Sequence, residues 1–222
     1  MENLPELVMR LMVYFVPFLF ALCFHEYAHG WVAQKRGDNT ALMMGRLTMN
    51  PLVHMDFFGT FILPLMAILF PGSIFFGWAK PVPVNSRNLK NPRVDMFWIA
   101  LAGPVSNLLL AALSAVVIFI VNKTMMTSVY FKPTVKFFDV FIVINLFLAI
   151  FNSIPVHPLD GGKILARFLP ERVNDMLERH EQAMSMVLLA IFILDGKTRY
   201  IIGMLEGPVD FLHHALLAAA LG

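Results

Sequence analysis

Residues 24–30 read FHEYAHG, and they lie inside an apolar run that extends from about Leu7 to Val32. A helix needs about 20 apolar residues to cross a bilayer, so this run is long enough to span a membrane. Each ionisable group inside such a helix costs about 2.5–3.5 kcal/mol. The polar group that consists of His25, Glu26 and His29 therefore needs a partner that offsets this cost, and a metal ion is one such partner.

The composition of the whole chain supports a membrane protein. Of its 222 residues, 58% are hydrophobic and 14% are charged, and the mean hydropathy is +0.70. Soluble domains carry about 25% charged residues, so too few charges are present here to cover a soluble surface. We expect an all-α, multi-pass integral membrane protein in which residues 1–222 form one domain. The net charge of +2 gives no indication of a nucleic-acid partner.

Five apolar stretches, including the first, predict about five to six transmembrane or re-entrant segments. The second stretch contains Pro64, Pro71 and Gly72, which interrupt regular helices, so we expect a partial or re-entrant segment there. The last stretch is broken in the middle and holds one or two spans. The four stretches after the first cover residues 57–78, 96–121, 135–154 and about 183–221.

Two connecting segments have patterns of their own. Residues 79–94 include PVPV at 81–84, which predicts a short extended or β element at a sheet edge, because proline cannot donate to a ladder. Residues 163–181 mix charged and apolar side chains and are interrupted at Pro170. They predict an amphipathic helix on the membrane surface or, equally, a solvated loop helix. The core of the domain is expected at about 20–165, followed by amphipathic and membrane segments at 163–222.

The spacing of the two histidines suggests a metal site. His25 and His29 are four residues apart, so on a helix both imidazoles lie on one face and can bind the same zinc ion. Glu26 follows the first histidine directly, where its carboxylate can reach a water molecule on the metal. This HExxH pattern combines two metal ligands with a general base. The alternative is a polar cluster that faces a helix interface and binds no metal.

A catalytic zinc site also needs a third protein ligand and one open position. We favour Asp160, which lies in the sequence HPLDGGK just after the fourth apolar stretch. The two glycines after it allow a sharp turn that presents a short carboxylate. A turn or helix N-cap aspartate is the alternative interpretation. The other candidates are His54, Asp56, His157, His180, His213 and His214.

The order of these residues along the chain limits the topology. His25 and His29 lie near the end of the first apolar stretch, and Asp160 lies after the fourth. If the three residues share one metal ion, the two stretches must run in the same direction through the membrane. An odd number of crossings then separates them, which favours a partial segment at 57–78. The alternative is that residues 57–70 span the membrane and that the chain reaches the metal by a deep excursion after the fourth stretch.

Several motifs, taken together and in this order, resemble the site-2 proteases, a family of intramembrane zinc metalloproteases. The resemblance covers roughly residues 20–165 and is closest to the compact branch that lacks PDZ and CBS domains. The motifs are HEYAH at 25–29, NPLVHMDFFGT at 50–60, FGWAKPVPVN at 76–85, LAGPVSN at 101–107 and FNSIPVHPLDGG at 151–162.

The resemblance implies a role for each matching residue. His25, His29 and Asp160 would bind one Zn²⁺ ion per chain, and Glu26 would be the general base. Asn152 would hold the substrate or stabilise the oxyanion. The activity implied is hydrolysis of peptide bonds in transmembrane segments, as in regulated intramembrane proteolysis.

The resemblance also implies partners and a location. The segment with Val82, Pro83 and Val84 would pair with an unwound transmembrane protein or peptide substrate. The protein would lie in a lipid bilayer, as a multi-pass protein of the plasma membrane of a prokaryote. The oligomeric state stays open.

Two histidines remain unassigned. His157 lies where the family pattern predicts an apolar or small residue, so it is either a supporting group beside the metal or a competing ligand. His54 is either a catalytic auxiliary or a polar residue at the membrane interface.

Two other functions are compatible with polar groups inside membrane helices. A membrane divalent-metal transporter needs ligands staged along a path, and Glu26 would then be a ligand or a proton relay. A non-catalytic member of the same fold would bind the metal without turnover. The single cluster with a glutamate next to a histidine favours the protease.

Overall fold

The computed structural model describes residues 4–70, 77–198 and 200–221, and these residues form helices and connecting segments without a β-strand. Short π-helical turns occur at η1 (Leu11–Phe15) and η2 (Phe57–Ile62), and a 3₁₀ turn occurs at η3 (Ser86–Asn88). The α-helices are α1 (Leu4–Arg10), α2 (Val16–Lys35), α3 (Thr40–Met43), α4 (Pro51–His54), α5 (Leu63–Leu69), α6 (Pro92–Thr124), α7 (Phe131–Asn152), α8 (Asp160–Ala166), α9 (Glu171–Arg179), α10 (Glu181–Thr198) and α11 (Tyr200–Leu221).

Three helical segments among the described residues are long and apolar enough to cross a membrane. They are Leu4–Lys35, Pro92–Thr124 and Phe131–Asn152. The predicted total of five to six segments is therefore not confirmed. The second apolar stretch forms a shorter helix at Phe57–Leu69. It rises only about 20 Å, less than the roughly 30 Å of hydrocarbon in a bilayer, which agrees with a partial segment. Residues 71–76 of that stretch lie outside the described residues.

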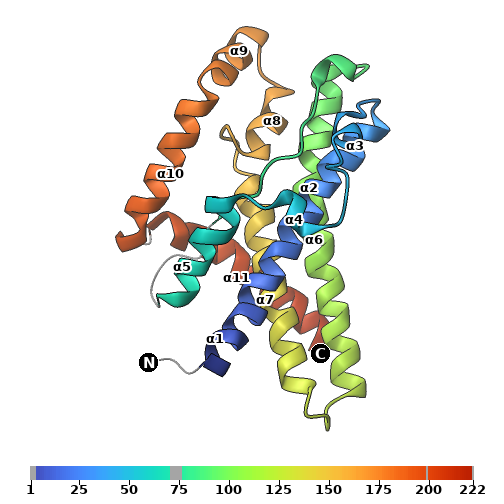
Figure 1. The fold of residues 1–222 in the computed structure, drawn as a ribbon, viewed down its shortest axis with the longest axis vertical. Helices are drawn as coiled ribbons and strands as arrows, with labels where there is room; N and C mark the ends of the chain where they lie inside the picture. Colours follow the sequence, from blue (N-terminus) through green and yellow to red (C-terminus); the bar gives the residue numbers. More distant parts are fainter. Residues whose placement is uncertain (1–3, 71–76, 199, 222) are drawn as a thin grey trace.

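The long helices α2, α6 and α7 form the centre of the molecule. Helix α6 packs against both α2 and α7. Figure 1 shows that α2 and α7 run in the same direction and that α6 runs in the opposite one. The C-terminal half of α2 and the chain that follows α7 therefore reach the same end of the bundle. This is the arrangement that a metal site shared by His25, His29 and Asp160 requires.

Small residues on α6 allow the helices to approach closely. Ala111 and Ala115 are buried against Ile142 and Leu146 of α7, and Val209 of α11 joins the same cluster. Helix contacts in membranes use such small residues, because close packing rather than water exclusion drives association there.

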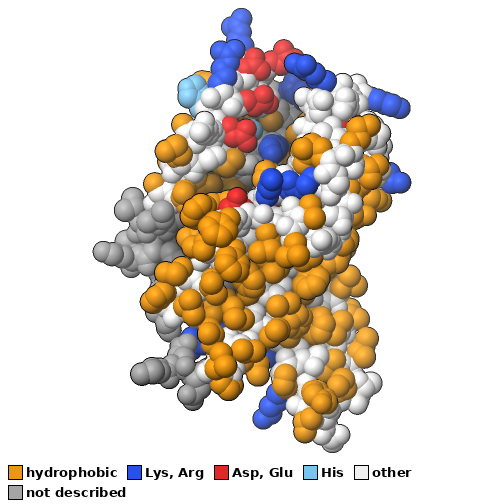
Figure 2. All heavy atoms as spheres, in the orientation of Figure 1, with side chains coloured by type: hydrophobic (Ala, Val, Ile, Leu, Met, Phe, Trp, Pro, Cys, Tyr) orange, Lys and Arg blue, Asp and Glu red, His pale blue; other side chains and the backbone are white. Residues whose placement is uncertain are grey.

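The surface has the pattern of a protein embedded in lipid. Figure 2 shows that hydrophobic side chains cover the middle of the face in view, and that charged side chains gather at the end that carries α9. On α6, the exposed side chains include Leu109 and Leu113, each 60% exposed. A protein in water would bury many of these side chains, whereas lipid tails are a suitable environment for them.

The proline-rich segment at 77–85 lies along α2 without forming a β ladder among the described residues, so the predicted β element is not confirmed. Ala79 belongs to one buried cluster with Phe18 and Leu22, in the first half of α2. Val84 packs against the buried cluster that includes Ala33, near the end of α2. The segment therefore runs in the same direction as the helix and passes the HEYAH turn on its way.

The amphipathic prediction for residues 163–181 corresponds to two helices. Helix α8 ends at Ala166, and α9 begins directly after Pro170, where the break was predicted. Helices α10 and α11 complete the C-terminal part of the chain.

Candidate metal centre

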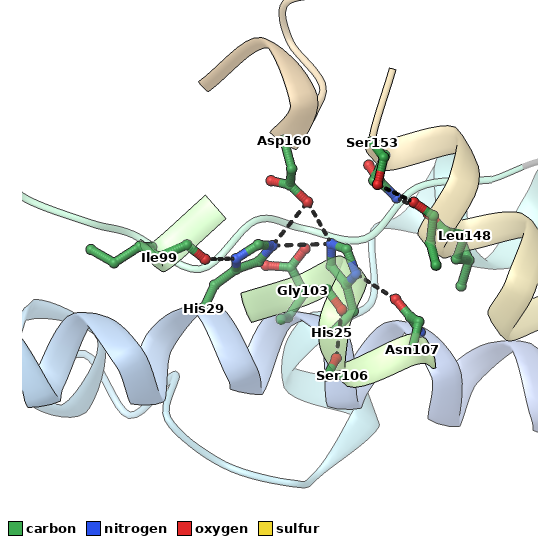
Figure 3. A network of polar contacts seen from close by, with 12 residues as sticks. His25, His29, Ile99, Gly103, Ser106, Asn107, Leu148, Ser153 and Asp160 are labelled. Carbon is green, nitrogen blue, oxygen red and sulfur yellow. Dashed lines mark hydrogen bonds and ion pairs between the residues drawn. The ribbon is translucent and has the colours of Figure 1, made fainter. Parts of the chain in front are cut away.

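Three buried side chains from distant parts of the sequence meet at one point. His25 and His29 extend from one face of α2, and Asp160 is the first residue of α8. The Nε2 atoms of the two imidazoles lie 3.0 Å apart. Asp160 Oδ2 lies 3.0 Å from His25 Nε2 and 3.2 Å from His29 Nε2. Figure 3 shows these atoms converging on a shared space.

The outer nitrogens of both imidazoles are committed to hydrogen bonds. His25 Nδ1 lies 2.6 Å from Asn107 Oδ1, and His29 Nδ1 lies 2.6 Å from the backbone oxygen of Ile99. Both partner atoms are acceptors, so each Nδ1 carries the proton and donates it. In the neutral imidazoles, each Nε2 then has a lone pair that points toward the other ring and toward Asp160.

This arrangement fits a cation. Two lone pairs and a carboxylate oxygen face one another at hydrogen-bond distance, and Asp160 Oδ2 is buried with no hydrogen-bond donor. Such a set is repulsive unless a positive charge lies between the atoms. Two imidazoles and one carboxylate are also a donor set that zinc uses, with a further position open for water. Among the described residues, His25, His29 and Asp160 form the group that could hold a metal ion.

Helix α6 holds the two imidazoles in place. The amide of Asn107 is oriented by its own donor group, which contacts the Ala21 carbonyl at 3.2 Å and Asn145 Oδ1 at 2.8 Å. Asn107 and Asn145 are both fully buried. The chain of amides from α7 through α6 to His25 therefore fixes the tautomer of that ligand, as outer hydrogen bonds do in zinc sites.

Gly103 of α6 provides the space for the rings. A Cβ atom added at this residue would lie 2.5 Å from the Cε1 atoms of both His25 and His29. This contact explains the glycine in the LAGPVSN motif, because any larger residue would displace the ligands.

Two further glycines allow Asp160 to lie beside His25 and His29. A Cβ atom at Gly161 would collide with the backbone of Ser153 and Ile154, and one at Gly162 would collide with the backbone of His157. The start of α8 can therefore pack directly on the turn that follows α7. Asp160 does not act as an N-cap, because Leu159 occupies that position and no side chain caps the helix.

Glu26 lies beside the metal group and is not one of its members. Its side chain is largely buried, at 9% exposed. Its Oε2 atom accepts a 2.7 Å hydrogen bond from the backbone N–H of Val82. The described structure therefore places the Glu26 carboxylate outside the ligand set, with one of its oxygens bound to the proline-rich segment.

Among the described residues, His54 is not a member of the metal group, and the amide of Asn152 hydrogen-bonds within α7. Asn152 donates a hydrogen bond from Nδ2 to Leu148 O, one turn earlier in α7, at 3.0 Å. His54 is buried, and its Nε2 lies 2.9 Å from the Thr48 carbonyl. Its own carbonyl accepts the N–H of Lys80. His54 therefore connects the loop before η2 to the proline-rich segment.

His157 is not a member of the metal group either, although it precedes Asp160 by three residues. It is buried and lines a separate cavity of about 350 Å³. Lys163 of α8 and Glu171 and Asn174 of α9 also line this cavity. The interpretation of His157 as a competing ligand therefore has no support in the geometry.

Residues that support the site are not among those predicted from the sequence. Asn107 and Asn145 are polar residues in the middle of apolar stretches, and that position is itself a signal of a buried functional contact. Asp38 was also missed. It is buried after the end of α2, where it accepts hydrogen bonds from Thr40, the Asn85 backbone and Asn88. Burial raises the pKa of Asp38, but these hydrogen bonds outweigh it and hold the pKa below its usual value.

Comparison with known proteins gives a consistent result. The chain matches peptidase family M50 over residues 13–135 and 122–194. It is 38% identical over 192 residues to the "Putative zinc metalloprotease YwhC" of Bacillus subtilis, a match that covers 86% of this chain and 81% of the relative. It is 25% identical over 197 residues to the "Putative zinc metalloprotease Rip2" of Mycolicibacterium smegmatis, covering 87% of this chain and 71% of the relative. No solved structure matches the chain significantly. With the site-2 protease motifs in order and a family match over most of its length, the chain belongs to peptidase family M50, the site-2 proteases.

Proposed function

We propose that this protein is a zinc-dependent intramembrane endopeptidase that cuts peptide bonds within or near transmembrane segments. The observation that carries the proposal is the position of Asp160 Oδ2 between two imidazole nitrogens that have no proton to donate. Zinc bound there would supply a Lewis acid that polarises a peptide carbonyl and makes a water molecule acidic near neutral pH.

The residues of the chain would divide the remaining work. His25, His29 and Asp160 hold the ion, with one ion per chain. Glu26 takes a proton from the attacking water and returns it to the leaving amine. Asn152 uses one N–H of its amide on Leu148, which leaves a second N–H for the substrate or the oxyanion. His54 would act indirectly, through the loop that it connects.

The substrate would be a transmembrane protein or peptide whose helix unwinds locally, since helical peptide bonds are engaged in their own hydrogen bonds. The segment with Val82, Pro83 and Val84 would receive the unwound chain by strand addition. Pro81 and Pro83 have no N–H, so we propose that the substrate binds there mainly by donating its own N–H groups to carbonyls of this segment.

We place the enzyme in the plasma membrane of a prokaryote, as a single membrane-embedded domain over residues 1–222. A divalent-metal transporter would need ligands staged along a path. Among the described residues, the potential ligands form one cluster. The transporter is therefore the weaker candidate.

The test uses the full chain reconstituted in liposomes. Purified protein is stripped of metal, and then either zinc or magnesium is added in the presence of a panel of single-span peptides. Cleavage restored by zinc alone, with cuts mapped by mass spectrometry to the apolar part of a peptide, would support the proposal. Cuts confined to the soluble flanks, or zinc uptake into the liposomes without any cleavage, would contradict it.

A further inference from the structure

The carboxylate of Glu26 is held by a backbone group from a distant segment. The N–H of Val82 donates to Glu26 Oε2 at 2.7 Å, across 56 residues of sequence. Both residues are more than nine-tenths buried. A hydrogen bond to an ionised carboxylate is stronger than one between neutral groups, so this contact is able to fix the direction of the side chain.

The pattern of hydrogen bonds in the proline-rich segment singles out Val82. The N–H of Trp78 donates to Gly59 O at 3.2 Å, and that of Lys80 donates to His54 O at 2.8 Å. Together with Val82, these donors alternate with a period of two, as in an extended chain with one edge turned toward the protein. Between and beyond them, Pro81 and Pro83 have no N–H at all. The N–H of Val82 is therefore the one backbone donor of residues 81–83.

The segment is fixed on both sides of Val82. Before it, Arg46 donates from Nη2 to the Lys80 carbonyl at 2.9 Å. After it, the N–H of Asn85 donates to Asp38 Oδ2 at 2.7 Å. The side chain of Val82 itself packs over Gly30 of α2, where an added Cβ atom would lie 3.1 Å from Val82 Cγ1. The donor thus has a defined position relative to the helix that carries Glu26.

The contact occupies Glu26 Oε2, which leaves Oε1 as the oxygen that can accept a proton. Among the described residues, no hydrogen bond engages Glu26 Oε1, whereas Oε2 is occupied by Val82. A glutamate has three rotatable side-chain bonds, and a base must lie within about 2.6–3.2 Å of the proton that it removes. Fixing one oxygen directs the second oxygen and lowers the entropy that the side chain loses in the reaction.

We propose that the backbone N–H of Val82 is a positioning group for Glu26, and that the PVPV segment is a rigid arm that places this donor. The inference rests on the proposed function, in which Glu26 is the general base. It assigns the arm a second role: one edge of the segment orients the base, while the opposite edge is the one available to the substrate. A substrate that binds the arm therefore binds next to an oriented base.

The sharpest test removes the N–H while keeping the Val82 side chain, and it also makes the Pro81 carbonyl, which Arg46 contacts at 3.4 Å, a weaker acceptor. Replacing Val82 by its α-hydroxy acid analogue converts the amide to an ester and keeps the side chain. We expect kcat to fall about 10- to 100-fold, the range for a displaced catalytic group, while KM changes less than about twofold and the zinc content stays the same. Val82→Pro removes the same N–H by ordinary mutagenesis, and its melting temperature and zinc content show whether it is folded.

Two matched variants separate positioning from a general effect on the segment. Lys80→Pro removes the preceding N–H on the same edge, whose partner is His54 O and not Glu26. It should lower the melting temperature with a much smaller effect on kcat than the ester. Glu26→Asp shortens the carboxylate and withdraws it from Val82, so the ester should lower kcat far less in this background than in the wild type.

The possible outcomes separate the positioning role of Val82 from the proposed protease activity. An active wild type and an equally active, zinc-loaded ester variant would overturn the positioning role and leave the protease proposal intact. A loss of kcat that is the same in the Glu26 and Glu26→Asp backgrounds would also overturn it. A zinc-loaded wild type that cuts no transmembrane peptide would overturn both proposals.

Discussion

Asn107 Oδ1 accepts a 2.6 Å hydrogen bond from His25 Nδ1, although the two residues are 82 positions apart. The bond connects α6 to α2 beside the metal group. Because Nδ1 carries the proton, His25 Nε2 has a lone pair that can bind a metal ion. An amide on one helix thus determines which nitrogen of a histidine on another helix can bind the metal.

Replacing Asn107 should weaken zinc binding without removing a ligand. We expect Asn107→Ala to lower zinc affinity about 10- to 100-fold, as the loss of an outer hydrogen bond does in other zinc sites. The measurement is a competition titration against a chromophoric chelator in detergent. The control is Ser114→Ala, which removes a buried hydroxyl of the same helix that donates to Leu110 O. Equal affinities of the two variants would contradict the assigned role of Asn107.

A methyl group at residue 103 should disrupt the site by contact alone. In Gly103→Ala the new Cβ atom would lie 2.5 Å from both imidazole rings, so His25 and His29 would have to move. We expect loss of zinc at stoichiometric concentration, measured by atomic emission after gel filtration. Gly203→Ala on α11 is the matched control, because its Cβ atom would meet no atom of the described residues within 4 Å. Full zinc content in Gly103→Ala would show that the rings are not fixed as described.

Zinc should stabilise the folded chain through Asp160. A ligand that binds only the folded state adds about 2.7 kcal/mol at 100 times its Kd. Zinc addition should therefore raise the melting temperature of metal-free wild type, and Asp160→Ala should show no such rise. The comparison uses differential scanning fluorimetry with magnesium as the control ion. A zinc-dependent rise that persists in Asp160→Ala would remove Asp160 from the ligand set.

Features of the site that depend on residues close together in the sequence could be predicted. The four-residue spacing of His25 and His29 is local, and the glycines after Asp160 are a local sign of a tight turn. Both predictions placed residues that the structure brings together. The parallel direction of α2 and α7 also followed, since the two ends of the site must meet at one metal ion.

Contacts between distant segments were harder to predict. The support by Asn107 and Gly103 depends on the rotation of α6 against α2, which no local period of the sequence encodes. The PVPV segment is typical of a β edge. However, the N–H groups of Trp78 and Lys80 bond to loop carbonyls and that of Val82 bonds to a side chain, so no ladder forms among the described residues. The number of spans was uncertain for a related reason. An apolar stretch indicates that a segment can enter the membrane, but packing against other helices decides whether it crosses completely.

The stability of the molecule should depend on Asp38 in a defined pH range. Its pKa is lowered in the folded state, so its contribution to stability is present above the unfolded value of 3.8 and is lost as the pH falls toward the folded pKa. Asp38→Asn should cost about 1–3 kcal/mol at pH 7, and its difference from wild type should shrink below about pH 4.

The check is thermal unfolding in detergent between pH 3 and pH 7. Asp175→Asn serves as the control, because Asp175 is an exposed carboxylate of α9. A difference between wild type and Asp38→Asn that does not change with pH would mean that the charge of Asp38 is not what stabilises the loop.

The most direct test of the central claim compares the wild type with Glu26→Gln, which keeps the shape of the side chain and removes its basicity. Zinc content and cleavage of single-span peptides are measured on the same samples, with Glu6→Gln on α1 as a distant control. The account predicts about one zinc per chain in all three proteins and cleavage by the wild type and Glu6→Gln alone. Loss of zinc from Glu26→Gln, or undiminished cleavage by it, would contradict the assignment of Glu26 as the base beside a His25, His29 and Asp160 metal site.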